Sequence, residues 1–173
     1  MLRKLSTFCQ LNVLKIAYYG LIYPHLAYGI IFWGCSADVH LIRIFKQQKY
    51  AMRILSNSGF RVSCRDKFKE LEIMTLPCIY IFEIIRFFIS KSNKIKGEDI
   101  HNYLTRFSNE FRIYEHRLSL FSHLPCQAGA KLFNHLPTSI KQLRSWDEIK
   151  KPLKKYLIQN SFYNVDEFIS HLD

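Results

Sequence analysis

The stretch YGLIYPHLAYGIIFWG, residues Tyr19–Gly34, decides whether this chain spans a membrane or folds as a helical protein in water. It lies within Ile16–Ala37, which contains no Asp, Glu, Lys or Arg and is long enough for a spanning helix of roughly 20 residues. However, Pro24 removes a backbone donor mid-stretch, and four tyrosines and a histidine would put polar atoms at membrane depth. We therefore expect two short buried helices that meet at Tyr23 and Pro24, and no membrane partner.

The composition predicts an ordered, helical chain. Hydrophobic residues make up 49% and aromatic residues 15% of the 173 residues, with only 6 glycines and 5 prolines. Such a chain is too apolar for disorder and too poor in turn residues for a sandwich of short strands. We expect a mainly α fold, in which a helical bundle is followed by a less regular α or α+β C-terminal region.

The cysteines and the first residues indicate an intracellular protein, in the nucleus or the cytoplasm. The five cysteines are odd in number and form no C-x-x-C pair, so neither a disulfide framework nor a zinc ribbon is expected. The opening MLRKLSTFCQLNVLK has no apolar core before Lys15 and no cleavage site of a secretory signal.

Helical periodicity and turn residues divide the chain into elements. The expected helices are Phe8–Tyr23, Leu26–Trp33, Ser36 or Asp38 to Leu55, Arg65–Glu72, Ile79–Ser90 and Ser145–Ile158. Thr75, with Pro77 two residues later, marks the start of the fifth helix, because proline is tolerated in a first turn. Ser145 is the expected N-cap of the last helix, with Glu148 as its capping-box partner. Residues 1–90 are expected to form a helical domain, residues 91–99 a polar hinge, and residues 100–173 the C-terminal region.

Residues 100–145 show no sustained periodicity, so we expect loops, short helices or a hairpin there. The expected turns lie at Leu124–Pro125, Gly129 and Leu136–Pro137. After the last helix, NSFYNVDEFISHLD is interpreted as a tail.

The helix that ends at Leu55 has two distinct faces. Its predicted core stripe recurs at steps of three and four residues and is broken only by one glutamine: Leu41, Phe45, Gln48, Met52 and Leu55. Arg43, Lys46, Lys49 and Arg53 follow similar steps but are offset from this stripe. The helix can therefore bury one face and offer the other to phosphate groups.

Positive charge is concentrated around this helix. The net charge is +11, and residues 36–69 hold eight basic residues against two acids. The eight candidate nucleic-acid-binding residues are Arg43, Lys46, Lys49, Arg53, Arg61, Arg65, Lys67 and Lys69. Such a surface favours a phosphate backbone first and anionic lipid second, and binding to nucleic acid would weaken steeply with salt.

No enzymatic pattern is present in the sequence. It contains no glycine-rich phosphate loop, no G-x-S-x-G, no H-E-x-x-H and no adjacent pair of aspartates for two magnesium ions. His116, His123, Cys126 and His135 lie near one another, but their spacing matches no familiar zinc site. We expect no catalytic residue, no bound metal and no cofactor.

Five motifs in order resemble the segment just past the polymerase core of non-LTR (LINE-type, jockey-like) retrotransposon reverse transcriptases. These motifs are LKIAYYGLIYPHLAYGIIFWG (Leu14–Gly34), IFKQQKYAMRIL (Ile44–Leu55), FKELEIMTLP (Phe68–Pro77), HNYLTR (His101–Arg106) and GAKLFNHLPTSIK (Gly129–Lys141). FYNVDEFI near the C-terminus is similar to the family's usual ending. One departure is Phe133, where the family often has Trp.

The resemblance implies a thumb and the region after it, without fingers, palm or endonuclease. Catalysis in this family rests on palm carboxylates, including a Phe/Tyr-Ala-Asp-Asp motif that precedes the matched region, and no Asp-Asp occurs here. By this resemblance, the thumb lies against the minor groove and backbone of the template-primer duplex. We expect a non-catalytic fragment that grips nucleic acid and whose other partners are the missing palm and fingers. The alternatives are a helical protein-interaction module, an inert relic, or a small membrane-associated protein.

Overall fold

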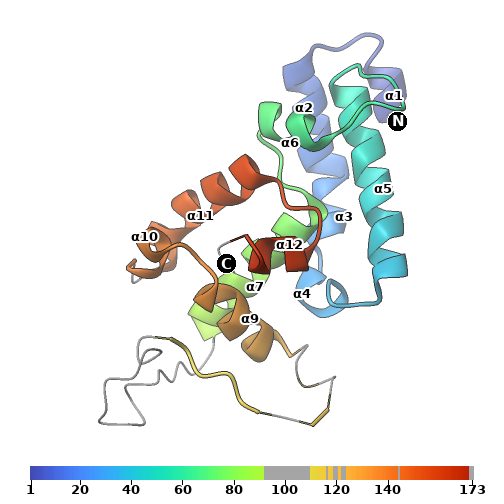
Figure 1. The fold of residues 1–173 in the computed structure, drawn as a ribbon. Coiled ribbons are helices and arrows are strands. Elements are labelled where there is room, and N and C mark those ends of the chain that lie inside the picture. Colours follow the sequence, from blue (N-terminus) through green and yellow to red (C-terminus); the bar gives the residue numbers. More distant parts are fainter. Residues whose placement is uncertain (92–109, 116, 119–120, 122–123, 144, 172–173) are drawn as a thin grey trace. The chain divides into compact units, whose positions relative to one another are not determined.

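The protein is mainly α-helical, as its composition predicts (Figure 1). The computed structural model describes residues 1–91, 110–115, 117–118, 121, 124–143 and 145–171, and no strand runs through these residues. The helices are α1 (Leu2–Leu5), α2 (Leu11–Leu21), α3 (Tyr23–Ala27), α4 (Ile30–Trp33), α5 (Asp38–Leu55), α6 (Arg65–Glu70), α7 (Leu76–Lys91), α9 (Pro125–Asn134), α10 (Thr138–Lys141), α11 (Trp146–Asn160) and α12 (Val165–Ile169).

The chain forms two compact units, and each unit is built from two separate stretches of sequence. The first unit contains Met1–Tyr80 and Lys155–Tyr163, and the second contains Ile81–Lys154 and Asn164–Asp173. The polar hinge expected at residues 91–99 falls, from residue 92 onward, outside the described residues.

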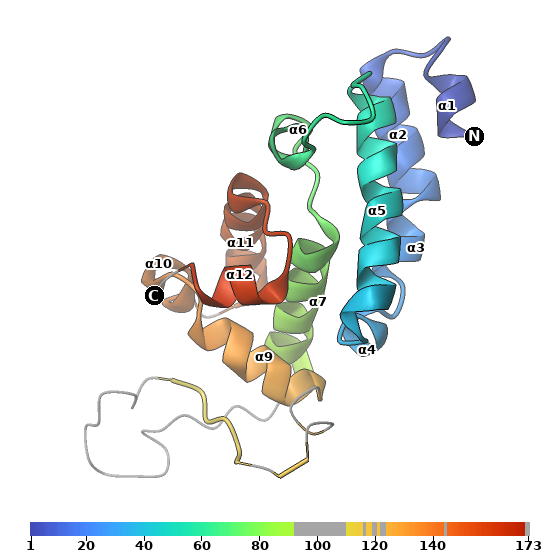
Figure 2. The same ribbon diagram turned by 45° about the vertical axis from the view of Figure 1, so that its right-hand side comes forward.

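The first unit contains a helical hairpin. Helices α2 and α3 run in one direction, α4 lies near the turn, and α5 returns alongside α2 (Figures 1 and 2). Pro24 lies in the first turn of α3, which begins at Tyr23, and its missing amide breaks no helical hydrogen bond there. The second expected helix is divided in two, because Gly29 adopts a left-handed conformation with φ of 62° between α3 and α4.

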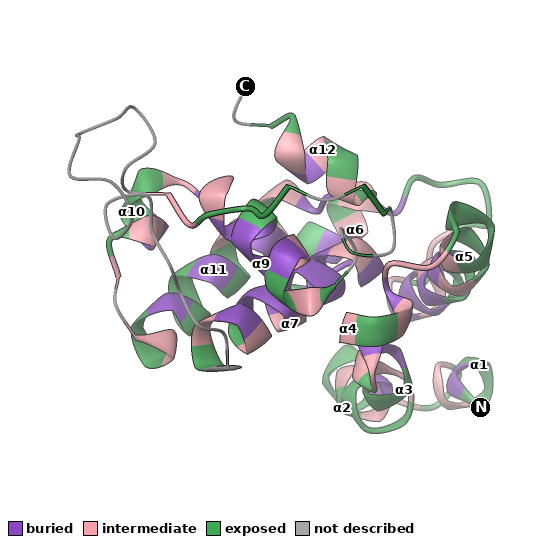
Figure 3. Cartoon of the chain, turned by 90° about the horizontal axis from the view of Figure 1, so that it is seen from below, coloured by how far each residue is buried: buried purple, intermediate pink, exposed green. Residues whose placement is uncertain are grey.

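The apolar stretch at the start of the chain is only partly buried, which corrects the expectation of a buried helical pair. Tyr18, Leu26 and Ile30 lie in the core, whereas Ile16 is 72% exposed and Tyr28 is 86% exposed. Figure 3 shows exposed turns along α2, α3 and α4. These helices are apolar on both faces, so α5 can cover only one of them. Within the described residues, no helix is both long and apolar enough to cross a membrane.

The core stripe of α5 is confirmed from Phe45 onward. Phe45, Gln48, Met52 and Leu55 are buried, together with Ala51. Neither expected N-cap is used, because the cap position is Ala37, which has no side-chain bond, and Asp38 lies inside the first turn. Asp38 is still favourable there, because a carboxylate near a helix N-terminus complements the helix dipole.

Gln48 is the polar break in this stripe, and its amide ties three parts of the first unit together. Its Nε2 atom donates to the hydroxyl of Tyr18 at 3.0 Å and to the carbonyl of Met74 at 2.9 Å. Burial raises the pKa of Tyr18, and the Gln48 bond opposes that shift. Gln48 is therefore a core residue that joins α5 to α2 and to the segment before α7.

The C-terminal segment Lys155–Tyr163 completes the core of the first unit. The Oγ1 atom of Thr75 donates to the carbonyl of Phe162 at 2.6 Å, and the thiol of Cys78 donates to the carbonyl of Leu157 at 3.4 Å. Phe162 and Leu157 are 1% and 0% exposed. Residues about eighty positions apart in sequence thus share one core.

The second unit is built around the later turns of α7. Phe88, Phe111 and Phe133 pack with ring centroids 5.0 to 6.1 Å apart, and Phe82 packs edge-on against Trp146 at 5.1 Å. The hairpin considered for residues 100–145 is not tested, because residues 100–109, 116, 119–120 and 122–123 lie outside the described residues.

Gly129 is inside α9, so the turn expected at this residue is wrong. A Cβ atom at Gly129 would lie 2.5 Å from Cβ of Phe88. This glycine is required for close helix packing and not for a turn.

The start of α11 agrees with the capping expected from sequence, whereas α12 was not expected. The backbone amide of Glu148 donates to Oγ of Ser145 at 3.3 Å, so Ser145 caps α11, which extends two residues beyond the expected end. The predicted tail instead contains α12, capped by Asn164, and its Phe168 is fully buried. The sequence signal was present, since Asn164 precedes two acids and an aromatic residue at helical spacing.

Candidate nucleic-acid interface

Arg43 and Lys46 lie exposed on α5, away from its core stripe. They are three residues apart, so their side chains project from adjacent turns of the same face. Neither residue has an ion-pair partner in the part of the chain that the structure describes. Their charges are consequently available to an external anion.

Lys49 and Arg53 lie at the border of the core face and are only partly exposed. The Lys49 ammonium lies 4.6 Å from the ring centroid of Phe45 and 5.4 Å from that of Tyr163. The Arg53 guanidinium lies 5.5 Å from the centroid of Phe60 and donates from Nη2 to the carbonyl of Val62 at 3.3 Å. Aromatic rings therefore hold both cations without neutralising them.

Arg65, at the start of α6, packs on the same tyrosine as Lys49. Its guanidinium lies 4.4 Å from the ring centroid of Tyr163. Burial raises the pKa of the Tyr163 hydroxyl and the nearby thiol of Cys64 adds to this, while Arg65 and Arg53 oppose the shift. Tyr163, which the sequence analysis left in the tail, is thus part of this basic region.

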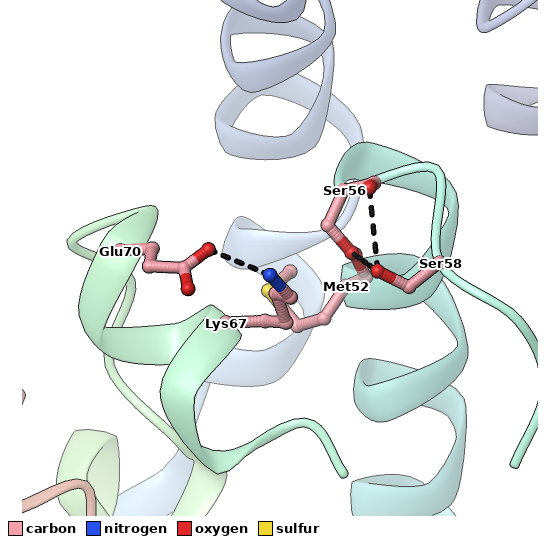
Figure 4. Close-up of polar contacts among 5 residues, drawn as sticks. All are labelled: Met52, Ser56, Ser58, Lys67 and Glu70. Carbon is pink, nitrogen blue, oxygen red and sulfur yellow. Dashed lines mark hydrogen bonds and ion pairs between the residues drawn. The ribbon is translucent and has the colours of Figure 1, made fainter. Parts of the chain in front are cut away.

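Lys67 is a candidate whose charge is compensated by an ion pair. Its ammonium lies 2.8 Å from a carboxylate oxygen of Glu70, one turn later in α6 (Figure 4). In the same view, the hydroxyl of Ser56 donates to the carbonyl of Met52 and contacts Ser58, which closes the end of α5. Arg61 and Lys69 are exposed.

The structure thus divides the eight predicted residues into three groups. Arg43, Lys46, Arg61 and Lys69 are exposed; Lys49, Arg53 and Arg65 are partly buried against aromatic rings; and Lys67 is paired with Glu70. Only the first group presents its cations fully to solvent, so it is the best candidate for contact with phosphate.

The first unit also contains basic residues that the sequence analysis did not select. Arg3 and Lys4 are exposed on α1, which packs against both α2 and α5. Counted over the whole unit, twelve lysines and arginines stand against four acidic residues, which is most of the chain's net charge of +11. The signal in the sequence was the absence of any acid before Asp38.

No metal centre is found where the structure can be described. No group of three or more His, Cys, Asp or Glu side chains in those residues could hold a metal ion. His116 and His123, two of the four candidates for a zinc site, lie outside the described residues.

Comparisons with known proteins identify no relative of this chain: no family profile, no curated protein and no solved structure matches it. The resemblance to non-LTR reverse transcriptases therefore stays a prediction from the motifs.

Proposed function

We propose that this chain binds a nucleic-acid duplex, as the thumb region of a non-LTR retrotransposon reverse transcriptase would, and has no polymerase activity of its own. The observation that supports this most is the exposure of Arg43 and Lys46 on α5, on a unit in which basic residues outnumber acidic residues three to one. Arg61 and Lys69 add exposed positive charge near α6.

Binding through these residues would depend on the phosphate backbone and not on base sequence. Each phosphate that a Lys or Arg neutralises releases condensed counterions, so the affinity falls as salt rises. The partly buried Lys49, Arg53 and Arg65 would act mainly by raising the local potential, because their side chains are held against Phe45, Phe60 and Tyr163.

The test is the salt dependence of binding to a fluorescently labelled RNA–DNA duplex. We expect the double variant Arg43→Gln, Lys46→Gln to lower the slope of log affinity against log salt by about 2, between about 50 and 200 mM salt. The matched control is Lys67→Gln, which removes a charge already paired with Glu70 and should change the slope less than Lys46→Gln does. A wild-type chain that retains no duplex at low salt would show the proposal to be wrong.

The polymerase palm and fingers are proposed as the protein partners, since the chain contains no Asp-Asp to hold catalytic magnesium. In this proposal the thumb binds the duplex, and the palm and fingers catalyse nucleotide addition. Incorporation of nucleotides by the isolated chain would contradict this division.

A second candidate is a helical protein-interaction module, with an inert relic as its inactive form. The exposed apolar side chains of α2–α4 favour it: Leu11, Val13, Ile16, Tyr19, Leu21, Tyr28 and Phe32 are 39% to 86% exposed. Contiguous exposed apolar surface is typical of protein-binding sites. We expect Tyr28→Ser, Phe32→Ser to reduce aggregation without lowering the Tm; increased aggregation would contradict this candidate.

A further inference from the structure

The solvent side of α11 has three lysines, Lys150, Lys151 and Lys154, which we call the α11 lysine face. All three are exposed, whereas Ile149 and Leu153 on the opposite side of the helix are 1% and 0% exposed. All these residues belong to the second unit. We propose that the α11 lysine face is a further binding surface for the phosphate backbone of nucleic acid, contributed by the second unit.

The lysines of this face repel one another and form no ion pair among the described residues. Lys150 and Lys154 are four residues apart, and Lys151 and Lys154 are three apart, so both pairs bring like charges together on adjacent turns. Asp147 lies one turn before Lys150 and Lys151, and Glu148 lies one turn before Lys151, yet neither acid forms an ion pair with these lysines. A polyanion would relieve this repulsion, which favours binding.

The chemistry of the helix favours nucleic acid over a lipid surface. Attachment to a bilayer by an amphipathic helix requires apolar side chains that can enter the membrane. The apolar side chains of α11 next to the lysines are buried in the protein core. Apart from Pro152, the exposed side chains around these lysines are charged, and a row of phosphates complements the lysines.

This inference rests on the proposed function, because it assumes that the chain binds a duplex at all. The experiment is the same salt series with the full chain and the triple variant Lys150→Gln, Lys151→Gln, Lys154→Gln. We expect the slope of log affinity against log salt to fall by about 2 to 3. Lys155, which belongs to the first unit, stays unchanged.

Two controls separate binding from folding. The triple arginine variant at the same positions keeps the charge and should keep the wild-type slope. The triple glutamine variant should melt at or above the wild-type temperature, because it removes like-charge pairs from the helix.

Three outcomes overturn the inference in distinguishable ways. If the wild-type chain binds the duplex and the triple glutamine variant keeps its slope, this inference is wrong while the proposed function stands. If the wild-type chain binds no duplex, both fail. If the triple variant loses binding only to phosphatidylserine vesicles, the face serves a lipid surface instead.

Discussion

At the residue scale, two glycines of the helical segments have opposite roles. A Cβ atom at Gly129 in α9 would lie 2.5 Å from Cβ and 2.9 Å from Cγ of Phe88, and rotating the phenylalanine side chain cannot move its Cβ. Gly20 in α2 has no atom within 4 Å of the same position. The same substitution should therefore have opposite effects at the two sites.

We expect Gly129→Ala to lower the free energy of unfolding. Overpacking costs typically about 1 to 3 kcal/mol, which exceeds the gain of about 0.5 to 1 kcal/mol from replacing a helical glycine. Gly20→Ala, the matched control, should raise the stability by up to about 1 kcal/mol. Urea denaturation measures both, and equal stabilisation by the two variants would contradict the close packing of Gly129 on Phe88.

The buried phenol of Tyr80 predicts a loss of stability in alkali. Desolvation, with a smaller contribution from Cys35, raises the pKa of Tyr80 from 10.0 to about 12. Between these values the folded state keeps a proton that the unfolded chain releases, so stability falls as the pH rises. In Tyr80→Phe, the loss in unfolding free energy between pH 10 and pH 12 should be smaller by about 2 kcal/mol.

This comparison is made by urea denaturation of both chains across the pH range. The other tyrosines and the lysines titrate in both chains, so the difference between them reports Tyr80. Parallel pH profiles for the two chains would show that the phenol is not desolvated in the folded state.

At the element scale, the sequence located most helices because their signals are local. Thr75 precedes α7 and its Oγ1 accepts from the amide of Cys78, and Ser145 caps α11. The turn predicted at Gly129 was wrong because the prediction did not include tertiary packing. A glycine in sequence suggests a turn, but Gly129 lies within α9. The residue is glycine because Phe88 leaves no space for a Cβ atom at this position.

Helix α11 contains a proline that destabilises the helix. Pro152 lies inside the helix and is exposed, so it loses a backbone hydrogen bond without gaining burial. A proline in a helix interior is about 3 kcal/mol less favourable than alanine, partly offset by the lower entropy of the unfolded chain. We expect Pro152→Ala to raise the unfolding free energy by about 1 to 3 kcal/mol.

Thermal melting followed by circular dichroism at a helix-sensitive wavelength tests this substitution. Lys151→Ala, at the exposed neighbouring position, is the control for a change of side chain without a change of backbone. A Pro152→Ala variant that melts below the wild type would mean that the proline sets a bend that the packing of α11 requires.

At the scale of the whole molecule, a hydrogen bond joins the start of α7 to the segment Lys155–Tyr163 near the end of the chain. The hydroxyl of Thr75, which is fully buried, donates to the carbonyl of Phe162. Thr75→Val keeps the shape but removes the hydroxyl that donates to this carbonyl and accepts from the amide of Cys78, so that the weaker thiol contact of Cys78 at 3.9 Å remains. We expect this loss to cost about 1 to 3 kcal/mol. We also expect faster amide exchange in residues 155–163, measured by mass spectrometry.

Thr7→Val is the control, because the Thr7 hydroxyl is exposed and bonds only to the nearby carbonyl of Lys4. Its effect should stay within about 0.5 kcal/mol, as for most surface substitutions. If both variants have the same stability as the wild type, the link between Thr75 and Phe162 does not hold the first unit together.

The candidate interface was predictable in outline but not in detail. The eight basic residues follow from charge counting, and the offset of Arg43 and Lys46 from the core stripe follows from helical periodicity. Lys49 and Arg65 both pack on Tyr163. The sequence does not predict this contact, because Tyr163 is about one hundred residues further along the chain. A contact between residues so far apart produces no periodic pattern in the sequence.

The sequence by itself determined that the protein is helical, where the four longest described helices (α2, α5, α7 and α11) lie, and that positive charge is concentrated around α5 and α6. Propensity, capping and charge are local properties, so the sequence can show them. Tertiary structure alone decided that Gln48 is a core residue, that Phe162 and Phe168 are buried, and that much of Tyr19–Gly34 is exposed. Burial depends on which distant segments pack together: α5 covers one side of α2, and nothing in the described chain covers Ile16, Tyr28 or Phe32.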